Sequence, residues 1–174
     1  MDAVSAAAGV NKTTIYRRWP GKKQLVAAAV DWMRRFVHDV PLPDTGSLEQ
    51  DLTAAFRRRV SFKDRVEGQA WARLLAEKHD PDVIAVIGDA VDERSGAWYA
   101  MVTRAVARAE LPEGTDPRRL LGMLAAVVDA WSARSPGGLK AELLEAAVRT
   151  IVAGARSGSL VRSGGGRGSV KKRK

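Results

Sequence analysis

The chain has 174 residues, of which 45% are hydrophobic and 28% are charged, and its formal net charge is +9; these proportions are ordinary for a soluble globular protein. It contains no cysteine, which excludes disulfides, thiolate metal sites and cysteine nucleophiles, and a chain of this length buries a sizeable core without such links. We find no secretory leader and no apolar run of the ~20 residues that a membrane span needs, so we expect a cytoplasmic protein without membrane contacts.

The N-terminal 40 residues predict three helices. Residues 2–8 are rich in alanine, Gly9 interrupts them, and Asn11 is a good N-cap for a helix over residues 12–19. A proline–glycine pair ends that helix. Apolar residues at three- and four-residue spacing then predict a further helix at about 22–37.

The rest of the chain also predicts helices, and no convincing alternating strand pattern is present. Two prolines and a glycine in residues 41–46 forbid a continuous helix, so we place a domain boundary there. Start and stop signals and apolar periodicity place the later helices at about 47–60, 66–78, 81–110, 117–134 and 139–155.

Basic charge is concentrated at the two ends of the sequence. Residues 1–36 hold seven Lys and Arg side chains against two acidic ones, which suggests a polyanionic partner. Residues 157–174 hold six with no acidic one and are otherwise rich in Gly and Ser, so we expect a disordered basic tail. This tail either strengthens nonspecific DNA binding or is a solubilising end without a partner.

The segment AGVNKTTIYRRWPGKKQL, residues 8–25, resembles the DNA-binding motif of the TetR/AcrR family of repressors. The shared pattern is an Ala-Gly-Val turn, a short recognition helix that ends in Tyr-x-x-aromatic, and a Lys-rich start to the next helix. The resemblance implies an all-α fold. Residues 1–40 would form a truncated helix-turn-helix domain, residues 47–156 a helical ligand-binding and dimerisation domain, and residues 157–174 the tail.

The physical chemistry of this segment supports DNA binding without the family. Gly9 supplies the positive φ that the turn between two helices needs, and the spacing of Val10, Ile15 and Trp19 predicts an anchoring face. The opposite face is basic and hydroxylated. The residues expected to contact DNA are Lys12, Thr13, Thr14, Tyr16, Arg17 and Lys22.

The expected contacts differ in kind. Thr13 and Thr14 lie near the start of the recognition helix, where side chains meet base edges in the major groove. Lys12, Tyr16 and Lys22 are candidates for phosphate contacts. The alternative is a solvated basic helix pair whose threonines only satisfy helix ends.

Members of the family have a further helix before the one predicted at residues 2–8. By this resemblance the domain lacks its first helix, either through a misassigned start or as a shortened regulator. The inner faces of Val4, Val10 and Ile15 would then lose cover, at about 1.5–3 kcal/mol for each exposed side chain. We therefore expect the 174 residues to bind operator DNA weakly or not at all, which a gel-shift comparison with an N-terminally extended chain tests.

The resemblance also implies an effector pocket and a dimer. Aromatic and Met side chains on the middle helices suit an apolar pocket, with core packing as the alternative; the candidates are Trp71, Trp98 and Met101. The last two helices form a four-helix bundle between subunits in the family, or else their apolar stripes face the monomer's own core. The candidate interface residues are Leu124, Val128, Trp131, Leu144, Val148 and Ile151.

Together these features predict a ligand-responsive regulator that binds double-stranded DNA. The resemblance implies a repressor that binds a palindromic operator as a homodimer and is released by a small apolar effector. The alternative is a truncated module that keeps dimerisation and ligand binding but does not bind DNA. An enzyme is poorly supported, because His38 and His79 are isolated and no catalytic motif is present. We expect no catalytic residue, no cofactor and no metal.

Overall fold

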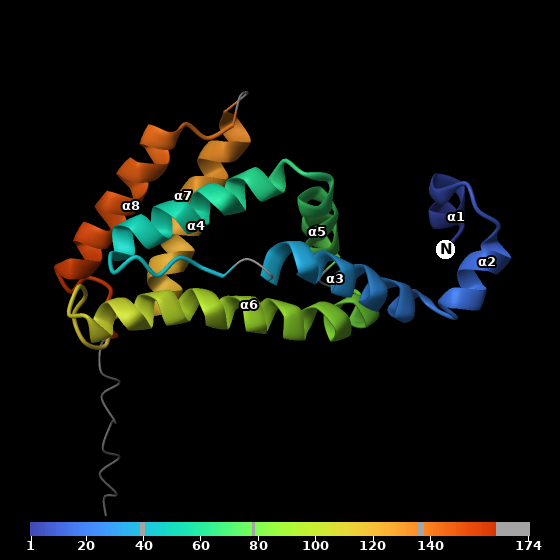
Figure 1. The fold of residues 1–174 in the computed structure, drawn as a ribbon, viewed down its shortest axis with the longest axis horizontal. Helices are drawn as coiled ribbons and strands as arrows, with labels where there is room; N and C mark the ends of the chain where they lie inside the picture. Colours follow the sequence, from blue (N-terminus) through green and yellow to red (C-terminus); the bar gives the residue numbers. More distant parts are fainter. Residues whose placement is uncertain (39–40, 78, 136–137, 163–174) are drawn as a thin grey trace, which may run out of the picture.

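The computed structural model describes residues 1–38, 41–77, 79–135 and 138–162, and this part of the chain is all-α, as predicted (Figure 1). One isolated antiparallel bridge joins Thr115 to Val161. None of the helices in these ranges is long and apolar enough to cross a membrane. The helices are α1 (Asp2–Ala8), α2 (Lys12–Arg18), α3 (Lys22–His38), α4 (Leu48–Lys63), α5 (Val66–Ala76), α6 (Pro81–Ala107), α7 (Pro117–Arg134) and α8 (Ala141–Arg156).

The main hydrophobic core lies between α4, α6, α7 and α8. Each of these helices contributes fully buried side chains at the three- and four-residue spacing that places them on one face. Phe56 of α4 meets Trp98 of α6 edge to face, with ring centroids 4.9 Å apart. The largest fully buried apolar side chains are Leu48, Leu52, Phe56, Met101, Leu120 and Leu124.

A second, smaller core joins α3 to the first turns of α6. Val26, Val30 and Met33 on α3 pack against Val83 and Ile87 on α6. Two apolar residues of α5 lie partly buried at the edge of this cluster. Helix α3 therefore connects the N-terminal helices to the body of the protein through the same helix, α6, that also enters the main core.

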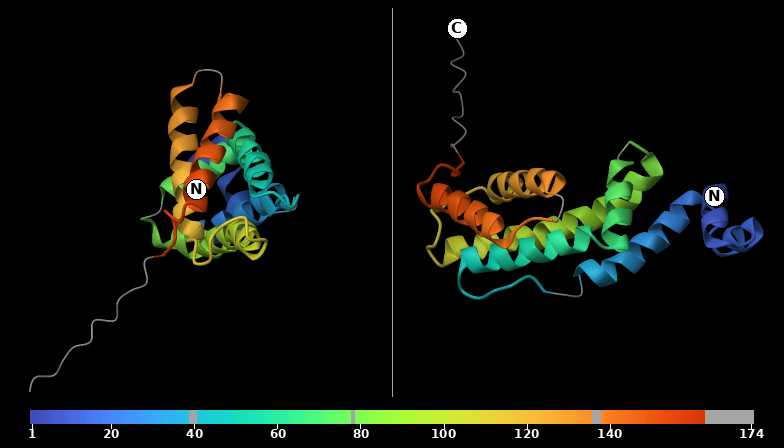
Figure 2. Two further views of the ribbon diagram at one scale, coloured as in Figure 1. Left: turned by 90° about the vertical axis from the view of Figure 1, so that its left-hand side faces the viewer. Right: turned by 90° about the horizontal axis from the view of Figure 1, so that it is seen from above.

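Helices α1 and α2 stand apart from both cores. They lie at the end of the molecule opposite α8, beyond the start of α3, in the views of Figures 1 and 2. Between residues 1 and 20 only Ile15 is buried. The packing of this end is therefore local, between α1 and α2.

The Pro- and Gly-containing segment before α4, expected as a domain boundary, is bonded to the body. Asp51 of α4 is fully buried and accepts hydrogen bonds from the backbone N–H and the hydroxyl of Thr45, both at 2.8 Å. The guanidinium of Arg104 donates to the carbonyl of Pro43 at 3.2 Å. The segment therefore ties the start of α4 to the C-terminal end of α6.

The disordered tail was predicted to begin at residue 157, but the chain is folded as far as residue 162. Residues 157–162 fold back on the α6–α7 connection, where Leu160 is buried and its carbonyl accepts a hydrogen bond from the Asp116 N–H at 2.9 Å. The guanidinium of Arg162 donates to the Asp116 carboxylate at 3.2 Å. Gly/Ser composition did not reveal these long-range contacts, and the remainder of the expected tail, 163–174, lies outside the described residues.

Candidate DNA-binding surface and effector cavity

The turn between α1 and α2 has the conformation that its sequence predicts. Gly9 adopts φ 62° and ψ 25°, a left-handed conformation that glycine accepts without a steric penalty. Its N–H closes the end of α1, and the next amide, that of Val10, bonds to the Ser5 carbonyl at 3.2 Å. Asn11 then caps α2 by accepting a hydrogen bond from the Thr13 N–H at 2.9 Å.

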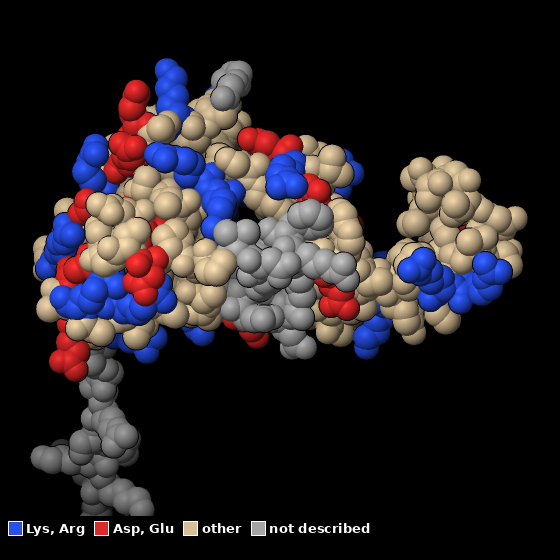
Figure 3. Space-filling view, in the orientation of Figure 1, with Lys and Arg blue, Asp and Glu red and all other residues tan. Residues whose placement is uncertain are grey.

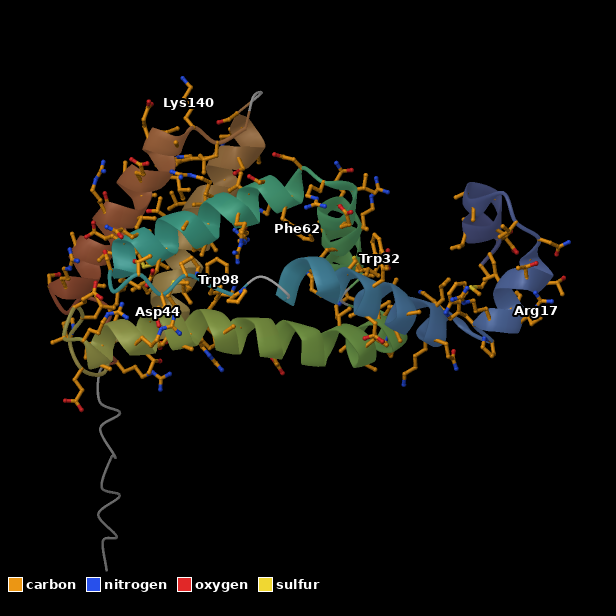
Figure 4. The ribbon with its side chains drawn as sticks, viewed as in Figure 1. Arg17, Trp32, Asp44, Phe62, Trp98 and Lys140 are labelled. Carbon is orange, nitrogen blue, oxygen red and sulfur yellow. The ribbon has the colours of Figure 1, made fainter. Side chains whose placement is uncertain are left out.

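All six side chains that the sequence predicts for DNA contact are exposed, and five of them are on α2. Arg17 lies at the outer end of the molecule in Figure 4. Ile15, 4% exposed, anchors the opposite side of α2. Val10 does not complete the predicted anchoring face, because its side chain is 42% exposed.

The basic side chains at this end gather over α2 in the space-filling view (Figure 3). Lys12 pairs with Asp2 of α1 and lies 5.8 Å from the centroid of the Tyr16 ring. The hydrogen bond and charge of Asp2 raise the pKa of the Lys12 ammonium, and the same contact lowers the pKa of the Asp2 carboxyl. The pair is exposed, so a phosphate can compete with Asp2 for Lys12.

Lys22 belongs to the first turn of α3 and pairs with Asp80, the residue directly before α6. Asp80 also accepts a hydrogen bond from the Val83 N–H at 3.3 Å and so caps α6. A predicted phosphate ligand is therefore held by the body of the protein. Lys23 was not among the predicted DNA contacts, but it is exposed in the same turn of α3. Its position next to Lys22 in the sequence could have identified it as a further candidate for a phosphate contact.

A cavity of about 390 Å³ lies between α4, α5, α6 and α7. In Figure 4, Phe62 and Trp98 lie between α4 and α6, in the region of this cavity. Of the predicted pocket residues, Trp71 and Trp98 line the cavity, but Met101 does not: it is fully buried in the main core, one turn further along α6. The other lining residues are Phe56, Arg59, Phe62, Lys63, Gly68, Ala72, Leu75, Ser95, Tyr99, Arg118, Leu121, Gly122 and Ala125.

Gly68 sets the shape of the cavity at the junction of α4 and α5. A Cβ atom at this position would lie 1.9 Å from the carbonyl oxygen of Phe62. No side chain fits so close to backbone, so α5 can cross the end of α4 only at a glycine.

Three basic side chains in the cavity wall were not predicted, because they come together only through the packing of two helices far apart in the sequence, α4 and α7. Arg59 donates to Asp129 through its two terminal guanidinium nitrogens, Nη1 and Nη2, at 2.8 and 2.9 Å, and Lys63 pairs with the same carboxylate. Burial alone would raise the pKa of Asp129, but the hydrogen bonds and charges of Arg59 and Lys63 outweigh it, and the pKa lies below its ordinary value. The guanidinium of Arg118 lies 5.8 Å from the centroid of the Tyr99 ring.

The predicted dimer interface requires a correction. Leu124, Val128, Leu144 and Val148 are buried in the core of the single chain, so they cannot supply an exposed surface to a partner. Their apolar spacing fits packing inside one subunit as well as packing between two. Of the six predicted residues, only Trp131 and Ile151 are partly exposed.

Apolar side chains of the same two helices point outward elsewhere. Met123 of α7 is 51% exposed and Leu143 of α8 is 38% exposed. Sequence reasoning missed both, because a helix that is apolar around most of its circumference does not show which face meets its own core.

Comparison with known proteins assigns both halves of the chain. Residues 1–29 match the family model described as bacterial regulatory proteins, tetR family, and residues 42–151 match the tetracyclin repressor-like, C-terminal domain. The HTH-type transcriptional regulator AqdR of Rhodococcus erythropolis is 29% identical over 152 residues, which cover 87% of this chain and 72% of that protein.

Two further relatives are mycobacterial. The DNA-binding transcriptional repressor TetR of Mycobacteroides abscessus is 34% identical over 127 residues, 70% of this chain and 63% of that repressor's length. An uncharacterised HTH-type transcriptional regulator of Mycobacterium bovis is 49% identical over 53 residues, 30% of this chain and 25% of that protein.

Proposed function

The chain belongs to the TetR family of DNA-binding transcriptional regulators, and on this premise we propose that it is a repressor that binds a palindromic operator as a homodimer. A small, largely apolar molecule in the cavity between α4 and α7 releases it from DNA. The name of the relative from Mycobacteroides abscessus, a DNA-binding transcriptional repressor, supports repression rather than activation.

The observation that carries DNA recognition is the exposed face of α2. Thr13, Thr14 and Arg17 are all exposed there, while Ile15 is buried on the other side. The Gly9 turn and the Asn11 cap fix how α2 leaves α1. A short helix presented in this way has the geometry of a recognition helix that enters the major groove from its N-terminal end.

Release by an effector is supported by the contacts of α6. Trp98 and Tyr99 of α6 line the cavity, and its first residues pack on α3, which follows α2 in the chain. A ligand that favours one position of α6 therefore also favours one position of α3 and α2. The free energy available for release is the difference in ligand affinity between the two positions.

A dimer is supported by the outward apolar side chains of α7 and α8. Met123 and Leu143, with the partly exposed Trp131 and Ile151, give the two helices an apolar outer surface. Two copies that pair these surfaces around a two-fold axis bury the same residues twice. The two α2 helices can then read two half-sites of one operator.

DNA recognition is tested by selecting operators from a random duplex pool with the 174-residue chain at low salt, about 50 mM, where phosphate contacts are strongest. Arg17→Ala and Thr14→Ala should each weaken binding to the selected duplex about tenfold in fluorescence anisotropy. Arg149→Ala, an exposed cation on α8, should leave the affinity unchanged. A pool without enriched sequences contradicts operator recognition by these 174 residues and favours a module that dimerises and binds a ligand but does not bind DNA.

Dimerisation is tested by sedimentation velocity at micromolar concentration. Met123→Glu and Leu143→Glu should convert a dimer into a monomer, because each places a charge in the apolar contact. Ile84→Glu is the matched control, since Ile84 is also an exposed apolar residue but lies on α6. A wild-type chain that sediments as a monomer rejects the dimer.

A further inference from the structure

The wall of the cavity combines aromatic surface with positive charge. Rings from α4, α5 and α6 provide most of the apolar lining, among them Phe62, Trp71, Trp98 and Tyr99. Arg59, Lys63 and Arg118 supply the charge, and none of the described lining residues is Asp or Glu. A molecule in the cavity therefore meets rings and cations.

Two of the three cations have a carboxylate partner behind the wall. Asp129 takes a bidentate hydrogen bond from Arg59 and also pairs with Lys63. Arg59 additionally lies 5.6 Å from the centroid of the Phe56 ring. These contacts hold the two side chains in place, and one negative charge compensates only one of the two positive charges.

Arg118 has a different environment. It is exposed in the first turn of α7, and its guanidinium makes no ion pair with any carboxylate in the described part of the chain. The neighbouring Arg119 differs, because it contacts Asp116 at 3.8 Å. Arg118 instead lies over the Tyr99 ring at the wall, which orients its planar donors but leaves them unmatched.

We propose that the effector is an amphipathic organic anion, with a planar apolar body between the aromatic rings and an acidic group that pairs with Arg118. This inference rests on the proposed effector role of the cavity. A guanidinium binds carboxylate, sulfonate or phosphate oxygens through two parallel hydrogen bonds. A neutral apolar molecule leaves Arg118 without such a partner, and a cation is repelled by all three basic side chains.

The test uses two fluorescent probes of the same aromatic skeleton. 8-Anilinonaphthalene-1-sulfonate carries an acidic group, and N-phenyl-1-naphthylamine lacks it. Energy transfer from tryptophan reports binding, since Trp71 and Trp98 line the cavity and a cavity variant locates the bound probe. The sulfonate probe should bind the wild-type chain about tenfold more tightly than the neutral probe, the effect of one charge-assisted hydrogen-bonded pair.

Arg118→Gln should abolish this preference by weakening the sulfonate probe about tenfold and leaving the neutral probe unchanged. Arg119→Gln is the matched control: it removes the same charge from the adjacent position of α7, outside the cavity lining, and should change neither probe. Circular dichroism melts confirm that each variant is folded.

A third variant shows whether the probes occupy the cavity. Gly122 lines the cavity, and a Cβ atom there meets no atom within 4 Å, so Gly122→Leu adds a side chain at the cavity wall without a clash at Cβ. It should weaken both probes, whereas Gly96→Leu, at an equally open glycine on α6 outside the lining, should not.

The outcomes separate the two proposals. If both probes bind equally and Arg118→Gln changes neither, the anionic effector is rejected while the cavity remains a ligand site. If Gly122→Leu affects neither probe, the cavity itself is rejected as the effector site. DNA recognition by α2 is measured independently and stands or falls by the operator selection.

Discussion

Buried side chains of α4, α6, α7 and α8 form one core, whereas α1 and α2 bury only Ile15. The body is further fixed by the Asp51–Thr45 hydrogen bonds and by the residues after α8 that fold back on the α6–α7 connection. The N-terminal helices rely on a glycine turn, a cap and the exposed Asp2–Lys12 ion pair. Regions with few buried contacts open at low free energy, so we expect the body to carry most of the stability and α2, the proposed recognition helix, to move more freely.

The two regions should differ most in how the truncation of a buried side chain affects the stability of the chain. Leu124→Ala removes a fully buried side chain of the body and should lower the free energy of unfolding by about 3 kcal/mol. The melting temperature should fall by about 10 °C in circular dichroism. Ile15→Ala should leave the melting of the body unchanged and abolish the selected-operator complex. An equal loss of melting temperature in both variants removes the distinction between the regions.

The next largest effect on the free energy of unfolding is expected at the junction of α4 and α5. Gly68→Ala forces a methyl group against the Phe62 carbonyl, so the backbone must move, at a cost of about 2 kcal/mol in urea unfolding. The displacement of α5 should also weaken both fluorescent probes. Gly88→Ala on α6, where a Cβ atom meets nothing within 4 Å, should be neutral or stabilising. A neutral Gly68→Ala contradicts the described contact.

The ion pair behind the cavity has a smaller and pH-dependent effect. Asp129→Asn should cost at most about 1 kcal/mol at pH 7, because the carboxylate is 41% exposed and therefore screened. The pKa of Asp129 is lowered in the folded chain, so its contribution is present above the unfolded pKa of about 4 and lost as the pH falls through the folded pKa. The gap between wild type and variant in unfolding experiments should close below about pH 4. A gap that persists there assigns the loss to packing instead.

The smallest effect is expected from the ion pair between Lys22 of α3 and Asp80, the residue before α6. Asp80→Asn keeps an oxygen for the α6 cap but removes the charge that holds Lys22. Lys22 then becomes more available to phosphate, and binding to the selected operator should tighten about threefold at low salt. Lys22→Met should weaken binding and cancel the effect of Asp80→Asn in the double variant. Tighter binding that persists without Lys22 rejects this competition.

Local features of the fold follow from the sequence. Gly9 and Asn11 predict the turn and the start of α2, because a positive φ and an N-cap depend on neighbours within a few residues. Composition, start and stop signals and apolar periodicity together predict the helices of the described chain to within a few residues. The exposed face of α2 follows from the same spacing.

Features that depend on packing between distant segments of the chain could not be predicted from the sequence. Leu124 and Val128 were expected at a subunit interface and lie in the monomer core, because periodicity shows that a face is apolar but not what covers it. Arg118 enters the cavity wall only because α7 packs beside α6. Leu160 is buried by contacts with a connection more than forty residues earlier, which the composition of its own segment does not show.

Under the proposed release mechanism, helix α6 is a lever between the cavity and α3. Its C-terminal end is fixed by Arg104 on the carbonyl of Pro43, and the 27 residues from Pro81 to Ala107 form one continuous helix about 40 Å long. Along the helix axis, Trp98 lies about 9 Å from Arg104, and Pro81 lies about 35 Å from it. If α6 pivots at Arg104 as a rigid rod, a sideways displacement at Trp98 grows about fourfold at Pro81. Under the proposed release mechanism, an effector that moves the Trp98 ring by about 1 Å would shift the end of α6 on which α3 packs by about 4 Å, comparable to the ~3.4 Å rise per base pair.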